Sequence, residues 1–292
     1  MKKSLIALNL LAIFLVGCQP NKEAPKDEKN MLPKRKQPKT IAYELKDAKQ
    51  WLLDSTLTDT EKELVFAVNR TDASNFKRMD TVIVPKDRSG DVAYYFPFPL
   101  SVPYLKDVDK IIYFSYPTQT FAAYECGELV RTGPTNMGRE DAQTPNGLFF
   151  TNWKAKKTIS TVNDEWELKW NFNILNKGGI GWHQYTMPGY PASHSCLRLV
   201  TKDAKYLYNW ADQWVLADKS TVLVKGTPVI VFGSYDFKAE KPWLKLVNDP
   251  HALDISENEI RQITEPFLNE ILAEQENRVN SKLKVQNIKA DT

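Results

Sequence analysis

The chain has 292 residues, of which 42% are hydrophobic and 26% are charged. Its 39 basic residues nearly balance 36 acidic ones, which leaves a net charge of +3 at pH 7. This balance, with no long basic stripe, excludes a nucleic-acid-binding protein whose affinity depends on phosphate contacts.

The first eighteen residues predict export and lipid attachment. Lys2-Lys3 forms a basic start, and residues 5–16 are apolar apart from one asparagine. This run is shorter than the ~20 residues of a membrane-spanning helix and fits a secretory signal peptide at 1–18. Leu15-Val16-Gly17-Cys18 resembles a bacterial lipobox, which implies cleavage before Cys18 and a lipid on its sulfur. An ordinary signal peptide with an incidental cysteine is the alternative.

Residues 19–40 are rich in Pro, Lys, Glu and Asn and contain almost no large apolar residues. Such a segment buries too little surface to order itself, so we expect a flexible tether. Gln19 takes the place of the aspartate that marks inner-membrane retention in enterobacteria. We therefore expect a periplasmic protein, lipid-anchored to the outer membrane.

Residues 41–108 predict a small α/β N-terminal region. The run from Thr58 to Glu61 is typical of a capped helix start. A helix that ends near Asn69, followed by a strand at 78–85, resembles the second half of a LysM peptidoglycan-binding module. That resemblance implies a wall-binding role, but the first half of the module is not recognisable. A structural appendage of the next domain is the alternative.

Residues 109–233 predict a mainly β domain. The segments 111–116, 120–125 and 129–132 form a meander of short strands, in which Cys126-Gly127 is typical of a hairpin turn. The segments 221–224 and 229–232 predict a further strand, turn and strand.

Helices are expected after the last cysteine and at the C-terminal end. Thr201 is a candidate N-cap with Asp203 in the first turn, and apolar residues at helical spacing then predict a core-facing helix. In the C-terminal extension, 234–292, an amphipathic helix at 254–278 is expected to dock on the domain. We find no chemistry in it.

The segment from Gly181 to Arg198 gathers two of the three histidines, a cysteine and an arginine. A thiol becomes a useful nucleophile when a base removes its proton and a cation stabilises the thiolate. Cys196 is the candidate nucleophile, and pairing with Cys126 would silence it, so we expect both thiols to be free. Arg198 lies two residues after Cys196, so both side chains share a face in an extended segment.

Zinc is the alternative for this cluster. His183, His194 and Cys196 are candidate ligands, with His251 as a remote fourth. A mononuclear peptidase site usually includes a carboxylate or a further histidine close by, and no acid occurs between Gly181 and Val200. We therefore favour cysteine chemistry and expect neither a metal nor another cofactor.

This segment resembles the active-site signature of the L,D-transpeptidase catalytic domain family (YkuD-like): a histidine, a variable loop, then Ser/Thr-His-Gly-Cys-x-Arg/Asn. The blocks at 131–138 and 144–149 are similar to upstream motifs of the same family. Two residues depart from the pattern, because Ser195 replaces the usual glycine and Gln184 follows the first histidine where glycine is common.

The resemblance implies a fold and a set of roles. The fold is a mainly β (α+β) sandwich with a helix after the cysteine loop, flanked here by the small α/β appendage and the C-terminal helix. Cys196 is the implied nucleophile and His183 the implied general base. The residues implied in substrate binding or in the oxyanion hole are Asn136, Tyr185, Ser193, His194, Ser195 and Arg198.

The implied activity is that of a cell-wall L,D-transpeptidase. Cys196 accepts an acyl group from a peptidoglycan tetrapeptide stem and transfers it to an amine, which makes a 3→3 crosslink or a related exchange product. Peptidoglycan stem peptides and the membrane are the implied partners, and reactivity with carbapenems is expected. The alternatives are a non-catalytic peptidoglycan-binding lipoprotein that retains the fold and an L,D-carboxypeptidase that uses water.

Overall fold

The computed structural model describes residues 34–160 and 165–290. The signal peptide at 1–18 with Cys18, and all of the expected tether before residue 34, lie outside the described residues. Within the described ranges, no helix combines the length and apolar character needed to cross a membrane.

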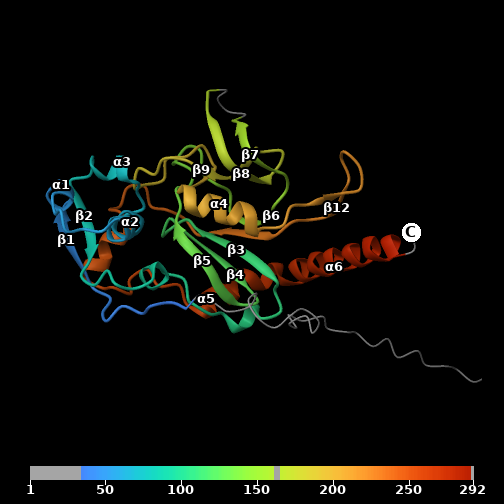
Figure 1. Cartoon of the computed structure of the whole chain (residues 1–292), viewed down its shortest axis with the longest axis horizontal. Helices are drawn as coiled ribbons and strands as arrows, with labels where there is room; N and C mark the ends of the chain where they lie inside the picture. Colours follow the sequence, from blue (N-terminus) through green and yellow to red (C-terminus); the bar gives the residue numbers. More distant parts are fainter. Residues whose placement is uncertain (1–33, 161–164, 291–292) are drawn as a thin grey trace, which may run out of the picture.

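A two-stranded antiparallel sheet with short helices forms the N-terminal region at the left of Figure 1. Thr58 and Glu61 form a reciprocal capping box, as the sequence predicts, and Asn69 follows the helix that they start. The elements are β1 (Tyr43–Asp47), α1 (Ala48–Leu52), α2 (Asp59–Val68), α3 (Ala73–Phe76) and β2 (Thr81–Pro85). Two 3₁₀ turns, at Val92–Tyr95 and Pro103–Leu105, lead to the next sheet.

The predicted meander forms most of a five-stranded sheet. Its members are β3 (Lys110–Ser115), β4 (Thr120–Glu125), β5 (Glu128–Pro134), β6 (Gly147–Phe150) and β13 (Pro228–Phe232), in the order β5-β4-β3-β13-β6. The predicted turn between β4 and β5 is confirmed, because Cys126 and Gly127 have φ values of 48° and 81°. Two positive φ values are typical of the type I′ turn that connects a tight hairpin.

The second sheet contains the cysteine motif. Its strands are β7 (Lys154–Ile159), β8 (Glu167–Leu175), β9 (Ile180–Gln184) and β10 (Leu197–Leu199), in the order β10-β9-β8-β7. Helix α4 (Thr201–Trp210) follows β10 at once, as expected. The predicted cap is wrong, because Val200 is the N-cap residue and makes no side-chain cap bond, while Thr201 is already helical.

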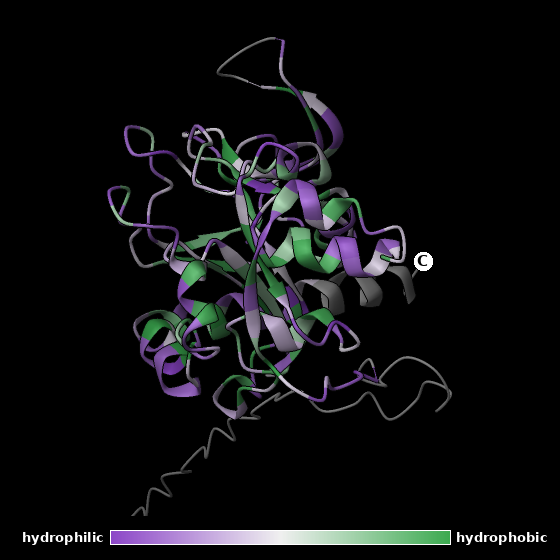
Figure 2. Cartoon of the chain, turned by 90° about the vertical axis from the view of Figure 1, so that its left-hand side faces the viewer, coloured by the Kyte–Doolittle hydropathy of each residue, from purple (hydrophilic) through white to green (hydrophobic). Residues whose placement is uncertain are grey.

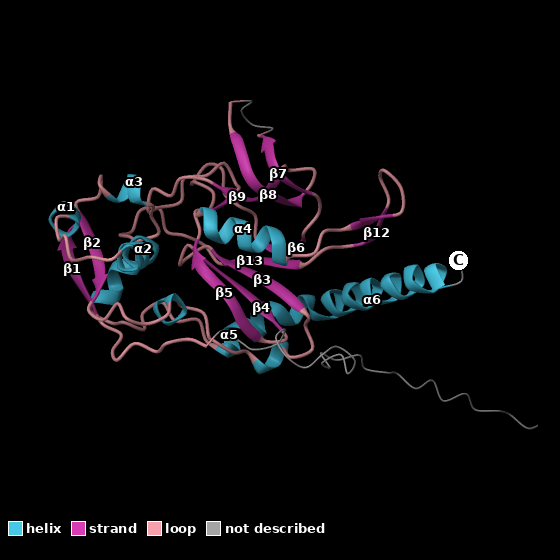
Figure 3. Cartoon of the chain, in the orientation of Figure 1, coloured by secondary structure: helices cyan, strands magenta, loops and turns pink. Residues whose placement is uncertain are grey.

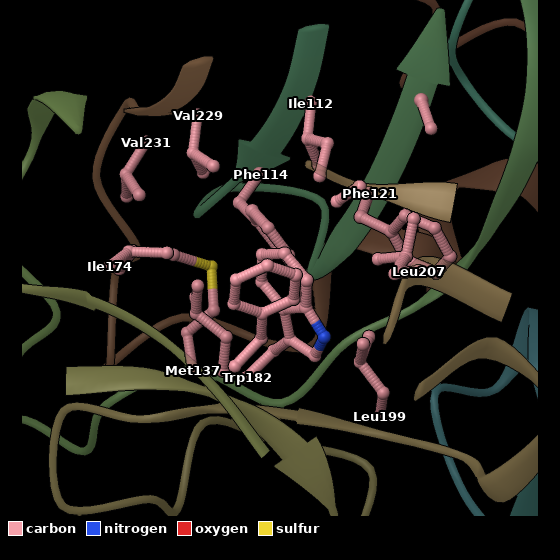
Figure 4. Packing of buried hydrophobic residues seen from close by; sticks show 14 of the residues in the cluster. Ile112, Phe114, Phe121, Met137, Ile174, Trp182, Leu199, Leu207, Val229 and Val231 are labelled. Atoms are coloured by element: carbon pink, nitrogen blue, oxygen red, sulfur yellow. The ribbon is translucent and has the colours of Figure 1, made fainter. Parts of the chain in front are cut away.

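The main hydrophobic core lies between the two sheets. Trp182, Leu197 and Leu199 of the four-stranded sheet meet Ile112 and Phe114 of the five-stranded sheet, all fully buried. Figure 4 shows Trp182 and Leu199 from one sheet and Ile112 and Phe114 from the other pointing into one space. Ala204 and Leu207 of α4 pack into the same core. The expected β-sandwich with a helix after the cysteine loop is therefore confirmed.

The strands near the C-terminal end of the domain pair differently from the sequence prediction. Both predicted strands exist, but β12 (Val222–Val224) pairs with β11 (Val215–Leu216) in a separate small sheet. Strand β13 instead lies between β3 and β6 in the large sheet. The buried Val229 and Val231 explain this separation, because their side chains enter the main core.

The C-terminal extension packs on two parts of the molecule. Trp243 and Leu246 join a cluster with Tyr43 and Leu64 of the N-terminal region, and residues 255–272 pack on the other face of the five-stranded sheet. In Figure 3 the last helix runs on beyond the sheet. The expected single helix is divided into α5 (Glu257–Thr264), a 3₁₀ turn at Glu265–Phe267 and α6 (Leu268–Ala290). Pro266 explains the division because it has no N–H for a helical bond. Ile260 and Ile271 are buried against Tyr113 and Ile230 of the sheet. In Figure 2 the hydrophobic strands accordingly lie inside, and the hydrophilic loops outside.

Candidate active site

Two parallel strands, β9 and β10, bring the motif residues together. Their register pairs Trp182 with Leu197 and His183 with Arg198. Since Trp182 and Leu197 point into the core, His183 and Arg198 face the other side of the sheet. Cys196 directly precedes β10 and lies two residues before Arg198, which places it on the same outer face.

His183 is buried, with 4% of its surface exposed. Its Nδ1 lies 3.1 Å from the carbonyl oxygen of Gln184. A carbonyl can only accept, so Nδ1 must donate its hydrogen and Nε2 keeps a lone pair available for a proton. Burial is the main cause that lowers the pKa of His183 to about 4; the Gln184 carbonyl opposes this shift, and the charge of Arg198 adds to it. The imidazole is therefore neutral at pH 7.

Cys196 is a free thiol, as expected, but the same expectation for Cys126 is wrong, because Cys126 is disulfide-bonded. Burial raises its pKa, while the backbone N–H of Gly181 and the charge of Arg198 act in the opposite direction. Its sulfur lies 4.0 Å from the carbonyl oxygen of Gly179. Within the described residues, neither ring nitrogen of His183 hydrogen-bonds the sulfur. Both the thiol and the imidazole are thus neutral in this structure.

The turn before Cys196 has a left-handed backbone. Ser195 adopts φ 72°, which explains why this family motif usually has glycine here. Serine is accommodated because its Oγ donates to the Ala142 carbonyl at 3.1 Å, and its own carbonyl accepts from Thr144 Oγ1 at 2.9 Å. Ser193 Oγ donates to the Cys196 carbonyl at 2.5 Å. These bonds fix the turn that presents the sulfur.

The backbone N–H groups of Ser195 and Cys196 make no hydrogen bond with any other described residue. Two adjacent free donors beside a nucleophile are the requirement for an oxyanion hole. The predicted assignment of these two donors is therefore geometrically possible.

A small cavity of about 30 Å³ opens over the sulfur. This volume holds only about two water molecules, so a peptide requires side-chain movement to reach Cys196. His194 packs on Trp166 with ring centroids 5.1 Å apart, and burial, with Arg139 and Arg198 adding to it, lowers its pKa. The lining residues are Ser160, Trp166, Leu168, His183, Tyr185, Ser193, His194, Cys196 and Arg198.

The Tyr185 ring lies between the Arg198 guanidinium and the neutral His183 imidazole. The Arg198 guanidinium lies 4.5 Å from the Tyr185 ring centroid, and the His183 ring lies 5.8 Å from the same ring. Asn136 lies behind the site and does not line the cavity. Its backbone exchanges two hydrogen bonds with Arg198, at 3.0 and 2.9 Å, and its Nδ2 donates to the Tyr190 carbonyl. Asn136 supports β10 rather than facing the sulfur.

No sequence pattern predicted that Trp166 and Leu168 would line the cavity. Trp166 directly precedes β8, and Leu168 lies in β8. It identified Thr144 only as part of a turn, whereas the structure places its hydroxyl on the active-site turn. His251 is exposed and bonds Asp254 at 2.7 Å instead of approaching the motif. Within residues 34–160 and 165–290, no three His, Cys, Asp or Glu side chains are grouped to hold a metal ion.

Residues 109–231 match the family model of the L,D-transpeptidase catalytic domain (YkuD). This segment is an L,D-transpeptidase catalytic domain by family. The match includes both strands of the motif, so the resemblance seen in the sequence is confirmed for this part of the chain. No curated protein matches the sequence.

Several solved L,D-transpeptidases are similar to the catalytic domain. The enzyme from Stackebrandtia nassauensis is 24% identical over 44% of this chain and 57% of its own, with a TM-score of 0.36. The enzyme from Xylanimonas cellulosilytica is 23% identical over 42% and 60%, with a TM-score of 0.34. L,D-transpeptidase 3 from Mycobacterium tuberculosis, solved with a faropenem-derived adduct, is 21% identical over 43% and 60%, with a TM-score of 0.34. The chain thus spans less than two thirds of these structures.

Proposed function

We propose that the chain is a cysteine acyltransferase that acts on peptidoglycan stem peptides. The observation that supports this best is the register of β9 and β10. It places His183 opposite Arg198 with Cys196 at the head of the same strand, in one cavity and beside free backbone donors.

Acylation begins with the neutral thiol. Nε2 of His183 takes the proton from Cys196 as the sulfur attacks the carbonyl between the third and fourth residues of a tetrapeptide stem. The N–H groups of Ser195 and Cys196 stabilise the oxyanion, and Arg198 stabilises negative charge near the sulfur. The C–N bond then breaks, and the terminal D-Ala leaves with the proton that His183 held. The product is a thioester on Cys196.

The thioester is consumed by an amine. The side-chain amine of a diamino acid in a second stem attacks the carbonyl, His183 accepts its proton, and the thiolate leaves and is reprotonated. The new amide is a 3→3 crosslink. With water in place of the amine, the same steps give L,D-carboxypeptidase products.

The test combines purified protein with disaccharide tetrapeptides, followed by mass spectrometry. We expect crosslinked dimers and free D-Ala, and a mass increase on Cys196 with a carbapenem, whose strained carbonyl is an acyl donor. Cys196→Ala is the matched control. Tripeptides without dimers would establish the carboxypeptidase, and the absence of both products and of the adduct would leave only a binding role.

We further propose that the protein is a lipoprotein of the outer membrane. The lipobox-like Leu15-Val16-Gly17-Cys18 and the polar segment after it support the proposal. Membrane fractions from cells that produce the wild type and Cys18→Ala provide the test. We expect Cys18→Ala to be soluble in the periplasm or to remain unprocessed. Complete sedimentation of that variant with the outer membrane would show that wall or protein contacts anchor it instead.

For residues 41–108 we propose a wall-binding contribution of the LysM type. Its support is that two antiparallel strands, β1 and β2, enclose helices α1, α2 and α3 in the sequence. Sedimentation with purified sacculi tests this, with the Cys196→Ala protein used so that no covalent product contributes. No retention above that of an unrelated periplasmic protein would leave residues 41–108 as an appendage of the catalytic domain.

A further inference from the structure

The N-terminal region holds the loop that connects His183 to Cys196. Met187 lies in the middle of this loop and is fully buried. Its backbone N–H donates to Asp72 Oδ2 at 2.6 Å. Its carbonyl accepts from Thr71 Oγ1 at 2.9 Å and from the Asp72 N–H at 3.2 Å. Thr71 also forms a β-bridge with Pro188. Both backbone polar groups of Met187 are therefore bound by residues outside the matched domain.

The segment that makes these contacts is itself fixed on two sides. The Asn69 side chain accepts from the Ile83 N–H at 3.0 Å and donates to the Ile83 carbonyl at 2.7 Å, which ties the segment to β2. Arg70 Nε donates to the Thr118 carbonyl, in the turn between β3 and β4, at 3.0 Å. The Arg70 guanidinium also lies 5.1 Å from the Trp243 ring centroid. Thr71 and Asp72 thus have little freedom to move.

The loop that Thr71 and Asp72 bind also carries Tyr185, which contacts two side chains of the site. Tyr185 lies two residues before Met187, and its ring contacts Arg198 and His183 at centroid distances of 4.5 and 5.8 Å. Displacing Met187 would move Tyr185 and expose His183.

We propose that Thr71 and Asp72 are positioning residues for the acyl transfer, and that residues 41–108 act as a clamp on the active-site loop. The inference rests on the proposed function for its reaction. Its geometry rests on the hydrogen bonds that Thr71 and Asp72 make with Met187. It assigns to the N-terminal region a role that wall binding would not require.

Asp72→Asn is the decisive variant. One carboxylate oxygen of Asp72 accepts from the N–H groups of Ser74 and Asn75, at the start of α3, and the other accepts from Met187. An asparagine side chain has one acceptor, so one of these two connections must break. Asp87→Asn is the matched control. Asp87 likewise uses one oxygen for the Ser89 N–H and the other for the Lys39 N–H, away from the loop.

Acyl transfer to tetrapeptides is measured in the full chain, over a pH series. We expect Asp72→Asn to lower kcat/KM by about ten- to a hundredfold, the scale of a small misplacement of catalytic groups, mainly through kcat. Asp87→Asn stays within about twofold of wild type. The acidic limb of the Asp72→Asn profile moves to higher pH, because reduced burial raises the pKa of His183. The titratable groups that face His183 are Arg198 of β10, Cys196 directly before β10, Tyr185 of the loop and His194.

Two further measurements make the outcome decisive. Thr71→Val should show the same loss and Thr71→Ser should restore activity, since only the hydroxyl donates to Met187. Alkylation of Cys196 by iodoacetamide should be faster in Asp72→Asn than in Asp87→Asn, because the thiol stays in place while the loop loosens. Wild-type activity with no loss in Asp72→Asn and Thr71→Val overturns the clamp. No acyl transfer by the wild type refutes the proposed function instead, and the clamp is then judged by whether alkylation differs between Asp72→Asn and Asp87→Asn.

Discussion

Arg198 is paired with His183 across the parallel strands β10 and β9, so a permanent cation lies beside the proposed base. Together with burial, this charge lowers the pKa of His183 to about 4. The same cation lies near the Cys196 sulfur and favours its thiolate, although burial has the larger effect and raises the thiol pKa. The charge of Arg198 therefore acts on both groups: it adds to the effect of burial on His183 and opposes the effect of burial on Cys196.

Replacement of the nucleophile should separate chemistry from folding. Cys196→Ala is expected to abolish transfer from tetrapeptides and acylation by carbapenems. The substitution removes one small, partly exposed side chain, so the unfolding temperature should change by no more than about 2–4 °C. Mass spectrometry of the products and thermal unfolding measure the two effects. Dimer formation by Cys196→Ala would contradict the mechanism.

The two histidines should differ in their effect on acylation. His183→Ala is expected to slow acylation by about 10² to 10⁴, the usual contribution of a positioned general base. His194→Ala should mainly weaken substrate binding, because His194 lines the cavity against Trp166. Acylation rate constants at several carbapenem concentrations separate the two effects. If His194→Ala has the larger loss at saturation, the roles are exchanged.

The pH dependence follows from the lowered pKa of His183. Its folded pKa of about 4 lies below the ordinary 6.5, so the unfolded chain binds the extra proton first as the pH falls. The contribution of this group to stability is full above about pH 6.5 and is lost as the pH falls toward 4. Denaturant unfolding between pH 4 and 7 should show this loss in the wild type and a smaller one in His183→Gln. An equal loss in both would contradict the assignment.

Alkylation should report the neutral resting state. Because burial raises the pKa of Cys196 and the imidazole is neutral, iodoacetamide should react slowly at pH 7 and faster through the alkaline range. A plateau of fast alkylation between pH 5 and 7 would instead reveal a preformed thiolate–imidazolium pair. The Cys196→Ala protein corrects for reaction at other groups.

Ser195 should tolerate replacement by glycine but not by a β-branched residue. Ser195→Gly relieves a left-handed backbone, which costs roughly 1–2 kcal/mol for other residues, but loses the bond to the Ala142 carbonyl, worth about 1 kcal/mol. We expect near-unchanged stability and activity. Ser195→Val, which is β-branched and has no hydroxyl, should lower both. Urea unfolding and carbapenem acylation measure the pair, and equal behaviour of the two variants would contradict the role of φ at this turn.

Gly181 should be irreplaceable for a different reason. A Cβ at this position would lie 2.2 Å from the Phe172 carbonyl oxygen, so Gly181→Ala must push β9 away from β8. We expect a destabilisation of the order of 1–3 kcal/mol and a loss of acylation, because Gly181 also donates to the sulfur. Gly178→Ala is the control, since its Cβ would meet only flexible side-chain carbons at 3.0 Å or more. Similar stability of the two variants would contradict the close approach.

Local patterns in the sequence determined much of this protein. Three features depend only on neighbours a few residues away, and all of them form as expected. They are the capping box at Thr58, the tight turn at Cys126-Gly127 and the short strands of the meander. The cysteine motif is equally local, so the sequence alone predicted the family of residues 109–231. The roles of Cys196 as nucleophile and His183 as base are proposals from the same motif. The expectation of a free Cys196 followed from the same chemistry.

Only the tertiary structure decided the features that depend on distant partners. Thr144 meets Ser195 across 51 residues of chain, and Asp72 meets Met187 across 115, so no spacing in the sequence reveals either bond. The placement of β13 between β3 and β6 likewise depends on which apolar side chains fill the core between the sheets. Sequence periodicity shows which face of a strand is buried, but the free energy of packing decides which strand lies beside it. Packing likewise decides the register of β10 on β9, which places Arg198 opposite His183 while Trp182 and Leu197 enter the core.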